Sequence, residues 1–239
     1  MSVTRALPRL TGVLGALWAV RLLPGALGTP PPENLLWTGA LALWVGACLA
    51  LIRLDHIRIA AGVLAALSLA LMPVLQPQDS PELALMAWFG LILAVTEGRP
   101  AERALLIRTC VTTVYAFAAL TKLNPVFVGG DQIANVITTR PQLQFLAGAT
   151  TTTAVVSLAL LTILIEGWLA VGLWFSSTQR WTAALGVVFH LVLLVSAPRG
   201  TLWGFALLVL LNGLLVVGYI AFFDRGTADS TRRVAWAAS

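Results

Sequence analysis

Residues 152–175, TTAVVSLALLTILIEGWLAVGLWF, decide the fold class, because they are apolar almost throughout and carry a single charged residue, Glu166. A helix needs about 20 mostly apolar residues to cross the hydrocarbon core of a bilayer. This stretch therefore predicts a transmembrane helix with one ionisable side chain inside it.

The rest of the chain has the same character. Its 239 residues are 59% hydrophobic and 10% charged, with a mean hydropathy of +0.90, whereas soluble domains carry about 25% charged residues. We expect an integral membrane protein of the all-α class, folded as a single polytopic helix bundle over residues 1–239. The start of the chain has no clear small-residue cleavage pattern, so a retained first span is expected rather than a removed signal peptide.

Eight apolar segments are long enough to be considered as spans, and glycine and proline mark most of the breaks between them. The segments are Leu10–Leu27, Leu35–Ile52, Ile57–Leu75, Leu83–Val95, Leu105–Leu123, Thr152–Phe175, Trp181–Ala197 and Leu202–Phe223. We therefore predict about eight transmembrane helices.

The arginines predict an orientation for these spans, because cytoplasmic loops of membrane proteins are enriched in basic residues. With the N-terminus inside, the outer side receives only Arg21, Arg140 and Arg199. The inner side receives Arg5, Arg9, Arg53, Arg58, Arg99, Arg103, Arg108, Arg180, Arg225, Arg232 and Arg233. Both termini are thus expected in the cytoplasm of a multi-pass cell-membrane protein, with 224–239 as a cytoplasmic tail. The net charge of +5 indicates topology and contact with anionic lipid, not nucleic acid.

The longest connection, residues 124–151, falls on the outer side in this topology and is rich in apolar residues. We expect a short interfacial helix over Asp131–Thr139, with a turn at Gly129-Gly130 before it and Asp131 as its cap. The segment is either an ordinary structured loop or a lid over a site at the outer face. A connection of this length in a compact domain is more often functional.

Lys122 is the only lysine in the chain, against fourteen arginines, and it ends an apolar run. An ionisable residue within a span is a candidate for function, although a lysine at a helix end can also extend its ammonium to the headgroups. Lysine that loses its hydration can act as a base, which arginine cannot. Tyr115 lies two helical turns before Lys122 on the same face, and Thr112 lies one turn further.

Glu166 and His190 lie near the middle of two consecutive spans that are joined by a short turn at 176–180. Each is roughly ten to fourteen residues from that turn, so the two side chains are expected at similar depths and within hydrogen-bonding reach, directly or through one water. They could serve as packing partners or as a proton-handling pair. One carboxylate and one histidine are too few ligands to predict a zinc or iron site. The two cysteines, Cys48 and Cys110, are expected to be packing thiols.

Two motifs in the second half resemble a known family. Residues 115–130, YAFAALTKLNPVFVGG, are similar to the first conserved region of the horizontally transferred transmembrane domain (HTTM), the membrane part of vitamin K-dependent gamma-carboxylase. EGWL at 166–169, QRW at 179–181 and GVVFH at 186–190 resemble its second conserved region. The resemblance covers about half of the chain, roughly Ala104–Ser196.

This resemblance implies a chemistry for Lys122. In the carboxylases the matching lysine is the base that deprotonates vitamin K hydroquinone, so a quinol of the vitamin K or menaquinone type is the implied cofactor. Two departures weigh against carboxylation of protein glutamate. These 239 residues contain no large peptide-gripping region, and one lysine stands where the carboxylases have two adjacent ones. A secreted peptide or a partner membrane protein remains a candidate partner beside the lipid bilayer.

The leading expectation is a carboxylase-like or quinone-linked membrane enzyme with its site at the outer face. Lys122, Glu166 and His190 would be catalytic, and the substrate or cofactor would contact Thr112, Tyr115, Asn124, Asp131 and Trp168. The alternative is a non-catalytic accessory, immunity or ligand-binding protein. A transporter is less favoured, because the two halves show no inverted repeat with broken helices.

Overall fold

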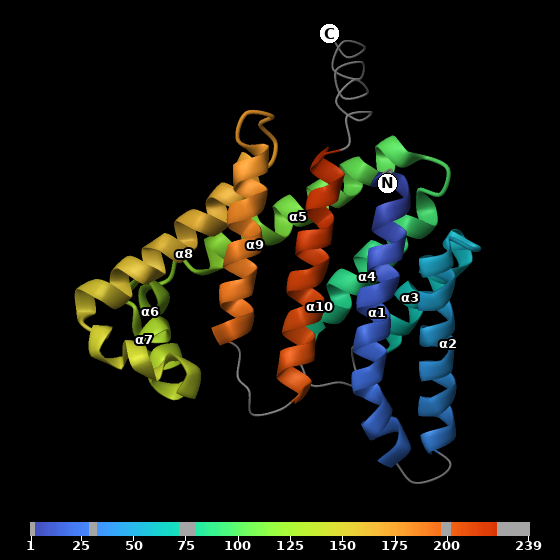
Figure 1. Cartoon of the computed structure of the whole chain (residues 1–239), viewed down its shortest axis with the longest axis horizontal. Coiled ribbons are helices and arrows are strands. Elements are labelled where there is room, and N and C mark those ends of the chain that lie inside the picture. The colour runs from blue at the N-terminus through green and yellow to red at the C-terminus, as the bar shows by residue number, and fades with distance from the viewer. Residues whose placement is uncertain (1–2, 29–32, 72–79, 197–201, 224–239) are drawn as a thin grey trace. The chain divides into compact units, whose positions relative to one another are not determined.

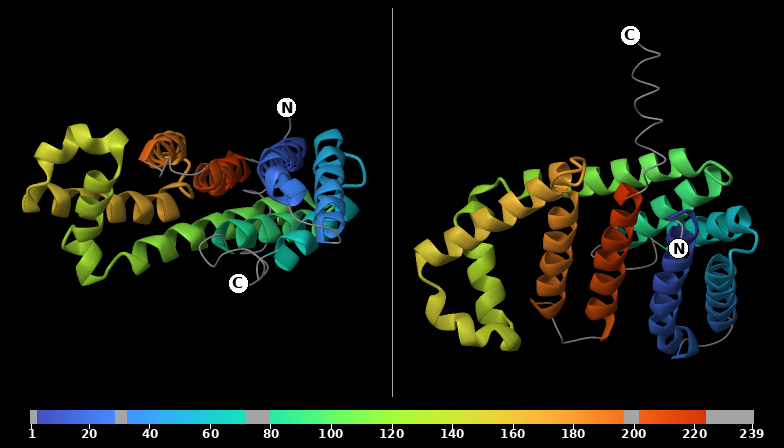
Figure 2. Two further views of the ribbon diagram at one scale, coloured as in Figure 1. Left: turned by 90° about the horizontal axis from the view of Figure 1, so that it is seen from below. Right: turned by 45° about the horizontal axis from the view of Figure 1, so that its top comes forward.

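The computed structural model describes residues 3–28, 33–71, 80–196 and 202–223, and every regular element within those ranges is a helix (Figures 1 and 2). The long helices in this part of the chain are α1 (Val3–Gly28), α2 (Glu33–Arg53), α3 (Ile57–Leu71), α4 (Ser80–Val95), α5 (Pro100–Thr121), α8 (Thr152–Gly172), α9 (Gln179–Ser196) and α10 (Leu202–Gly218). The expected all-α class is confirmed, and each of the eight apolar segments coincides with one of these helices.

Length and composition qualify three of the described helices as membrane spans: Leu35–Arg53, Pro100–Thr121 and Thr152–Gly172. Four further helical stretches are apolar but shorter, namely Ile57–Leu71, Leu83–Val95, Gln179–Leu194 and Val209–Phe223. The chain is therefore a helical protein with helices of membrane type. The ends of two expected segments, 72–75 and 197, lie outside the described residues, as does the expected tail at 224–239.

The chain divides into two compact units, one within Met1–Arg108 and Leu202–Ser239 and the other within Thr109–Thr201. In the first unit, α1 and α2 approach closely because glycine faces the neighbouring helix. A Cβ at Gly12 would lie 2.6 Å from the carbonyl oxygen of Cys48, and the indole nitrogen of Trp44 donates to the carbonyl of Gly15 at 2.9 Å. Small residues that let two backbones approach are typical of helix contacts in membranes.

Arg108 links α5 to the helix end that follows α10 in the first unit. Its guanidinium donates to the carbonyl oxygens of Ala221 at 2.7 Å and Phe222 at 3.2 Å, in the short helix η3 (Tyr219–Phe223) that follows α10. Carbonyls at a helix end have no partner within the helix, so a buried cation there satisfies them. Cys48 and Cys110 are both free thiols, and Cys48 is buried, as expected for a packing role.

The second unit begins within α5, whose last residue is Thr121. The amides of Lys122 and Leu123 bond to carbonyls three residues earlier, which tightens the final turn. The next two residues are Asn124 and Pro125, and proline disfavours a helical conformation for the residue before it. Lys122 is thereby placed just past the end of α5 rather than within a longer helix reaching Leu123.

The segment 124–151 is structured throughout. It contains α6 (Pro125–Val128), α7 (Asp131–Thr139) and the 3-10 helix η2 (Pro141–Ala149). The expected helix over Asp131–Thr139 is confirmed, whereas the expected cap is wrong. Gly130, at φ 86°, is the N-cap of α7, and Asp131 is its exposed first residue.

Gly130 is required here for two reasons. Its positive φ belongs to the left-handed region that glycine tolerates best, and a Cβ at this position would lie 2.6 Å from the side chain of Val155 on α8. The turn therefore brings the start of α7 directly against α8. The location of this segment at an outer membrane face stays a prediction.

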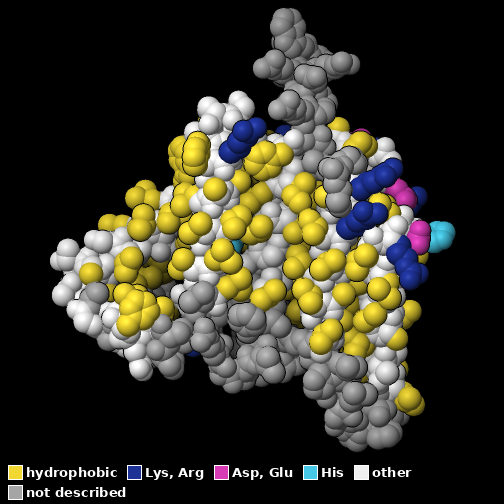
Figure 3. All heavy atoms as spheres, viewed as in Figure 1, with side chains coloured by type: hydrophobic (Ala, Val, Ile, Leu, Met, Phe, Trp, Pro, Cys, Tyr) yellow, Lys and Arg dark blue, Asp and Glu magenta, His cyan; other side chains and the backbone are white. Residues whose placement is uncertain are grey.

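Apolar side chains are spread over the visible surface in Figure 3, on helices of both units, and the few charged side chains lie near helix ends. Exposed large apolar residues occur on nearly every long helix, for example Leu43, Trp88, Phe117, Leu164 and Val188. A soluble monomer rarely exposes a large contiguous apolar area. This surface fits contact with lipid along the sides of the helices.

Candidate functional site

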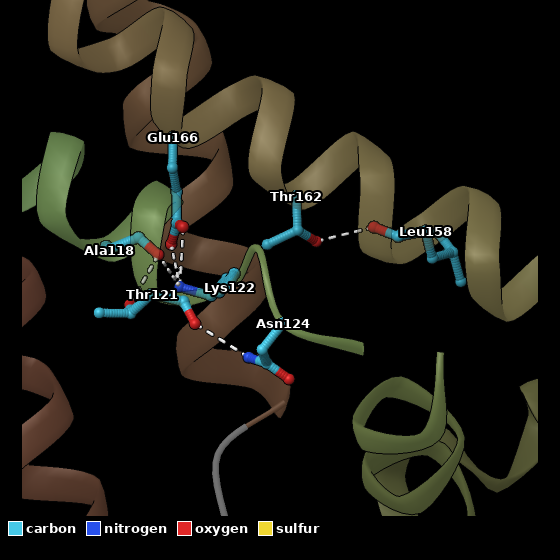
Figure 4. Close-up of polar contacts among 7 residues, drawn as sticks. All are labelled: Ala118, Thr121, Lys122, Asn124, Leu158, Thr162 and Glu166. Carbon is cyan, nitrogen blue, oxygen red and sulfur yellow. Dashed lines mark hydrogen bonds and ion pairs between the residues drawn. The ribbon is translucent and has the colours of Figure 1, made fainter. Parts of the chain in front are cut away.

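The candidate site is an ion pair between the only lysine of the chain and the one charged residue of α8. The ammonium nitrogen of Lys122 lies 2.8 Å from Oε1 and 2.7 Å from Oε2 of Glu166, so it bonds to both carboxylate oxygens (Figure 4). Hydrogen bonds in which both partners are charged are shorter and stronger than neutral ones. The contact joins the end of α5 to the interior of α8.

The Lys122 side chain turns back along α5. Its ammonium also donates to the carbonyl oxygen of Ala118 at 3.4 Å, and it lies 5.7 Å from the ring centre of Phe127 on α6. An ammonium has three hydrogens, and the two carboxylate oxygens together with this carbonyl can accept all three. Phe127 supplies an aromatic face beside the cation, a favourable arrangement for a positive charge.

Burial distinguishes this pair from a surface salt bridge. The Glu166 side chain is 8% exposed and the Lys122 side chain 26%, whereas the exposed pair Arg99–Glu102 has side chains 58% and 55% exposed. The inward orientation expected for Lys122 is confirmed, since its ammonium bonds to a buried carboxylate on another helix instead of extending outward. A cavity beneath the 124–151 segment remains a prediction.

Two residues at the start of α6 fix the position of Phe127. The side-chain oxygen of Asn124 accepts from the amide of Phe127 at 3.0 Å and caps this short helix, while Pro125 occupies its first turn. The Asn124 amide nitrogen donates to the carbonyl of Thr121 at 2.9 Å, which ties α6 to the end of α5 (Figure 4). Asn124 is exposed and does not contact the ion pair. Its role is to hold Phe127 beside the Lys122 ammonium.

A second buried polar pair joins α5 to α9. The hydroxyl of Tyr115 is hydrogen-bonded to Nε2 of His190, and both side chains are buried. Tyr115 on α5 and Lys122 just past its end are seven residues apart, so the two pairs lie about two helical turns from one another.

A direct hydrogen bond between Glu166 and His190 is not formed: Glu166 pairs with Lys122, and His190 with Tyr115. The reason is the direction in which the Glu166 side chain projects from α8. Trp168, two residues later and about 200° around the helix, donates its indole N–H to Thr182 on α9 at 2.9 Å. The face of α8 that contacts α9 therefore carries Trp168, and Glu166 points away from it.

The remaining expected site residues do not gather around the ion pair. Thr112 accepts a hydrogen bond from the indole N–H of Trp174 at 2.7 Å, and Trp168 is bonded to Thr182. Asp131 is exposed at the start of α7. Sequence reasoning missed Phe127 and the Ala118 carbonyl. The Asn124-Pro125 helix start was a usable signal for Phe127, because it predicts one turn of helix directly after Lys122.

The ion pair can hold or move a proton, and it can bind a hydroxyl or an anion through the ammonium. Within the described residues, no group of three or more histidine, cysteine, aspartate or glutamate side chains is placed to hold a metal ion. Comparisons with protein-family models, curated proteins and solved structures gave no match for this chain. The geometry of the site and the resemblance of the two motifs therefore indicate what the protein does.

Proposed function

We propose that the chain is a multi-pass membrane protein with about eight spans, both termini in the cytoplasm and the Lys122–Glu166 pair within the bilayer. The long apolar helices and their exposed apolar faces support membrane insertion. The distribution of the arginines supports the orientation.

Within this frame the protein acts as a membrane enzyme on a lipid-soluble molecule that carries an acidic hydroxyl, such as a quinol of the vitamin K or menaquinone type. The observation that carries the proposal is the buried, bidentate Lys122–Glu166 ion pair. The resemblance of the Lys122 motif to that of the vitamin K-dependent carboxylases agrees with it. Phe117, Leu120 and Leu123, which surround Lys122 in sequence, are exposed and apolar, so a lipid-soluble molecule could approach from the bilayer.

Lys122 and Glu166 have different roles in the proposed proton transfer. Lys122 passes one of its three protons to the Glu166 carboxylate, which leaves a neutral amine beside a neutral acid. The Lys122 amine then takes the proton of the arriving hydroxyl and becomes an ammonium again, next to the new negative charge. Glu166 thus ends with the proton, and the charge of Lys122 stabilises the deprotonated oxygen. Phe127 and Asn124 keep the ammonium in position.

A chromophoric phenol tests this proposal directly. A naphthol with an alkyl tail, added to the protein in nanodiscs at neutral pH, should show the absorbance band of its deprotonated form about tenfold above empty nanodiscs. Lys122→Arg should remove the increase, because arginine keeps the charge but does not give up its proton. An equal band with the arginine variant would remove Lys122 from the role of base.

The same ion pair also supports a second candidate function, a non-catalytic accessory or ligand-binding membrane protein. The acceptors around the Lys122 ammonium can take all three of its hydrogens, as in a contact that only joins two helices. A helix-joining role predicts no naphthol deprotonation by the native protein, so the experiment above separates the two functions.

A further inference from the structure

The turn between α8 and α9 combines exposed aromatic rings with a single cation. Val171, Trp174, Phe175 and Trp181 are exposed, and Trp181 is the most exposed of them at 79%. Arg180, next to Trp181, is exposed as well. The sequence from 167 to 196 contains no aspartate or glutamate, so no acidic side chain within the hairpin balances the arginine.

Three tryptophans lie along this hairpin, and they differ in whether the indole N–H has a partner within the protein. The N–H groups of Trp168 and Trp174 donate to threonines on neighbouring helices, Thr182 on α9 and Thr112 on α5. An indole N–H in hydrocarbon needs such a partner within the protein, because lipid tails offer none. Trp181 makes no hydrogen bond through its side chain to any residue in the described part of the chain. Its N–H is therefore available to an acceptor outside the protein.

We propose that this hairpin end, defined by Phe175, Arg180 and Trp181, lies in the phospholipid headgroup layer and fixes the depth of α8 and α9 in the bilayer. Tryptophan is enriched at this level because its ring is apolar and its N–H is polar. The Arg180 guanidinium meets lipid phosphates there, and the Trp181 N–H meets phosphate or ester oxygens. The proposal depends on membrane insertion, which is part of the proposed function, but not on proton transfer at Lys122.

This placement has a consequence for the ion pair. Gly172 is the last residue of α8, so Glu166 lies about 9 Å along the helix from that end. With the hairpin end at the headgroups, Glu166 and the ammonium bonded to it lie inside a hydrocarbon layer about 30 Å thick. A charge at that depth needs a partner, which accounts for the bidentate contact.

The depth of two positions on α9 tests the proposal. Leu191 is exposed like Trp181 and lies about 15 Å further along the helix. The full chain is reconstituted in phosphatidylcholine vesicles with bromine placed either near the headgroup or near the end of the acyl chain. The Trp181 signal is the fluorescence of the native protein minus that of Trp181→Phe, and the signal at 191 is that of Leu191→Trp minus native.

The Trp181 signal should be quenched about twofold more by bromine near the headgroup, and the signal at 191 about twofold more by bromine near the chain end. Both residues are exposed, so neither change should prevent folding. Quenching of Trp181 by neither lipid, or the same depth preference at both positions, would overturn the proposal. Neither outcome affects the naphthol result, so this placement can fail while the proton-transfer function stands.

Discussion

Replacing Glu166 with leucine should lower the free energy of unfolding by about 2–3 kcal/mol, somewhat below the 3–5 kcal/mol typical when one partner of a fully buried ion pair is removed. The loss arises because Lys122 keeps its charge but loses both carboxylate oxygens in apolar surroundings. The value is placed below the usual range because the Lys122 side chain retains some exposure. Denaturant titration in mixed micelles, followed by circular dichroism, measures the change.

Two further variants show whether the loss comes from the stranded charge. Adding Lys122→Met to Glu166→Leu should restore stability to within about 1 kcal/mol of the native protein, because no unpaired charge remains. Glu102→Leu removes an exposed acidic partner of Arg99 and should change stability by less than about 0.5 kcal/mol. A double variant no more stable than Glu166→Leu alone would mean that the leucine disturbs packing rather than stranding a charge.

The second large effect is on the chemical reactivity of Lys122. Glu166→Gln should raise the rate at which a membrane-permeant acylating reagent labels Lys122 by about ten- to hundredfold, because the side chain is no longer held in a bidentate ion pair with a buried carboxylate. The chain has no other lysine, so the amount of acylated Lys122 peptide, measured by mass spectrometry, reports on this one amine.

Glu102→Gln is the matched control for the labelling experiment. It removes an acidic side chain of the same kind from an exposed ion pair in the other compact unit, and the Lys122 labelling rate should stay within about twofold of the native rate. A native rate equal to that of Glu166→Gln would mean that the carboxylate does not control the reactivity of Lys122.

The helices could be predicted from the sequence because each is a long apolar run bounded by glycine, proline or charge. Even α7 can be predicted at Asp131–Thr139, since an amphipathic stretch follows Gly129-Gly130. The cap of that helix cannot, because the left-handed φ and the proximity of Val155 that require Gly130 become visible only when α7 is packed on α8.

The members of the candidate site could be predicted, but their pairing could not. Lys122, Glu166 and His190 stand out because ionisable groups are rare in apolar helices. Depth along a helix can be counted from a turn, whereas the direction in which a side chain faces depends on helix packing. The bond between Trp168 and Thr182 fixes that direction for α8 and turns Glu166 toward Lys122 rather than His190.

Isotope labelling can measure directly whether a charged Lys122 is bound by Glu166 within the membrane. With the lysine side-chain nitrogen labelled as 15N and the glutamate carboxyl carbons as 13C, the protein in lipid bilayers gives one lysine signal, because it has one lysine. Both oxygens of the Glu166 carboxylate are within 2.8 Å of that nitrogen. Dipolar recoupling should therefore show strong dephasing of an ammonium signal by a carboxyl carbon, and Glu166→Gln should abolish it. An undiminished signal in the native protein, or dephasing that survives Glu166→Gln, would contradict the account.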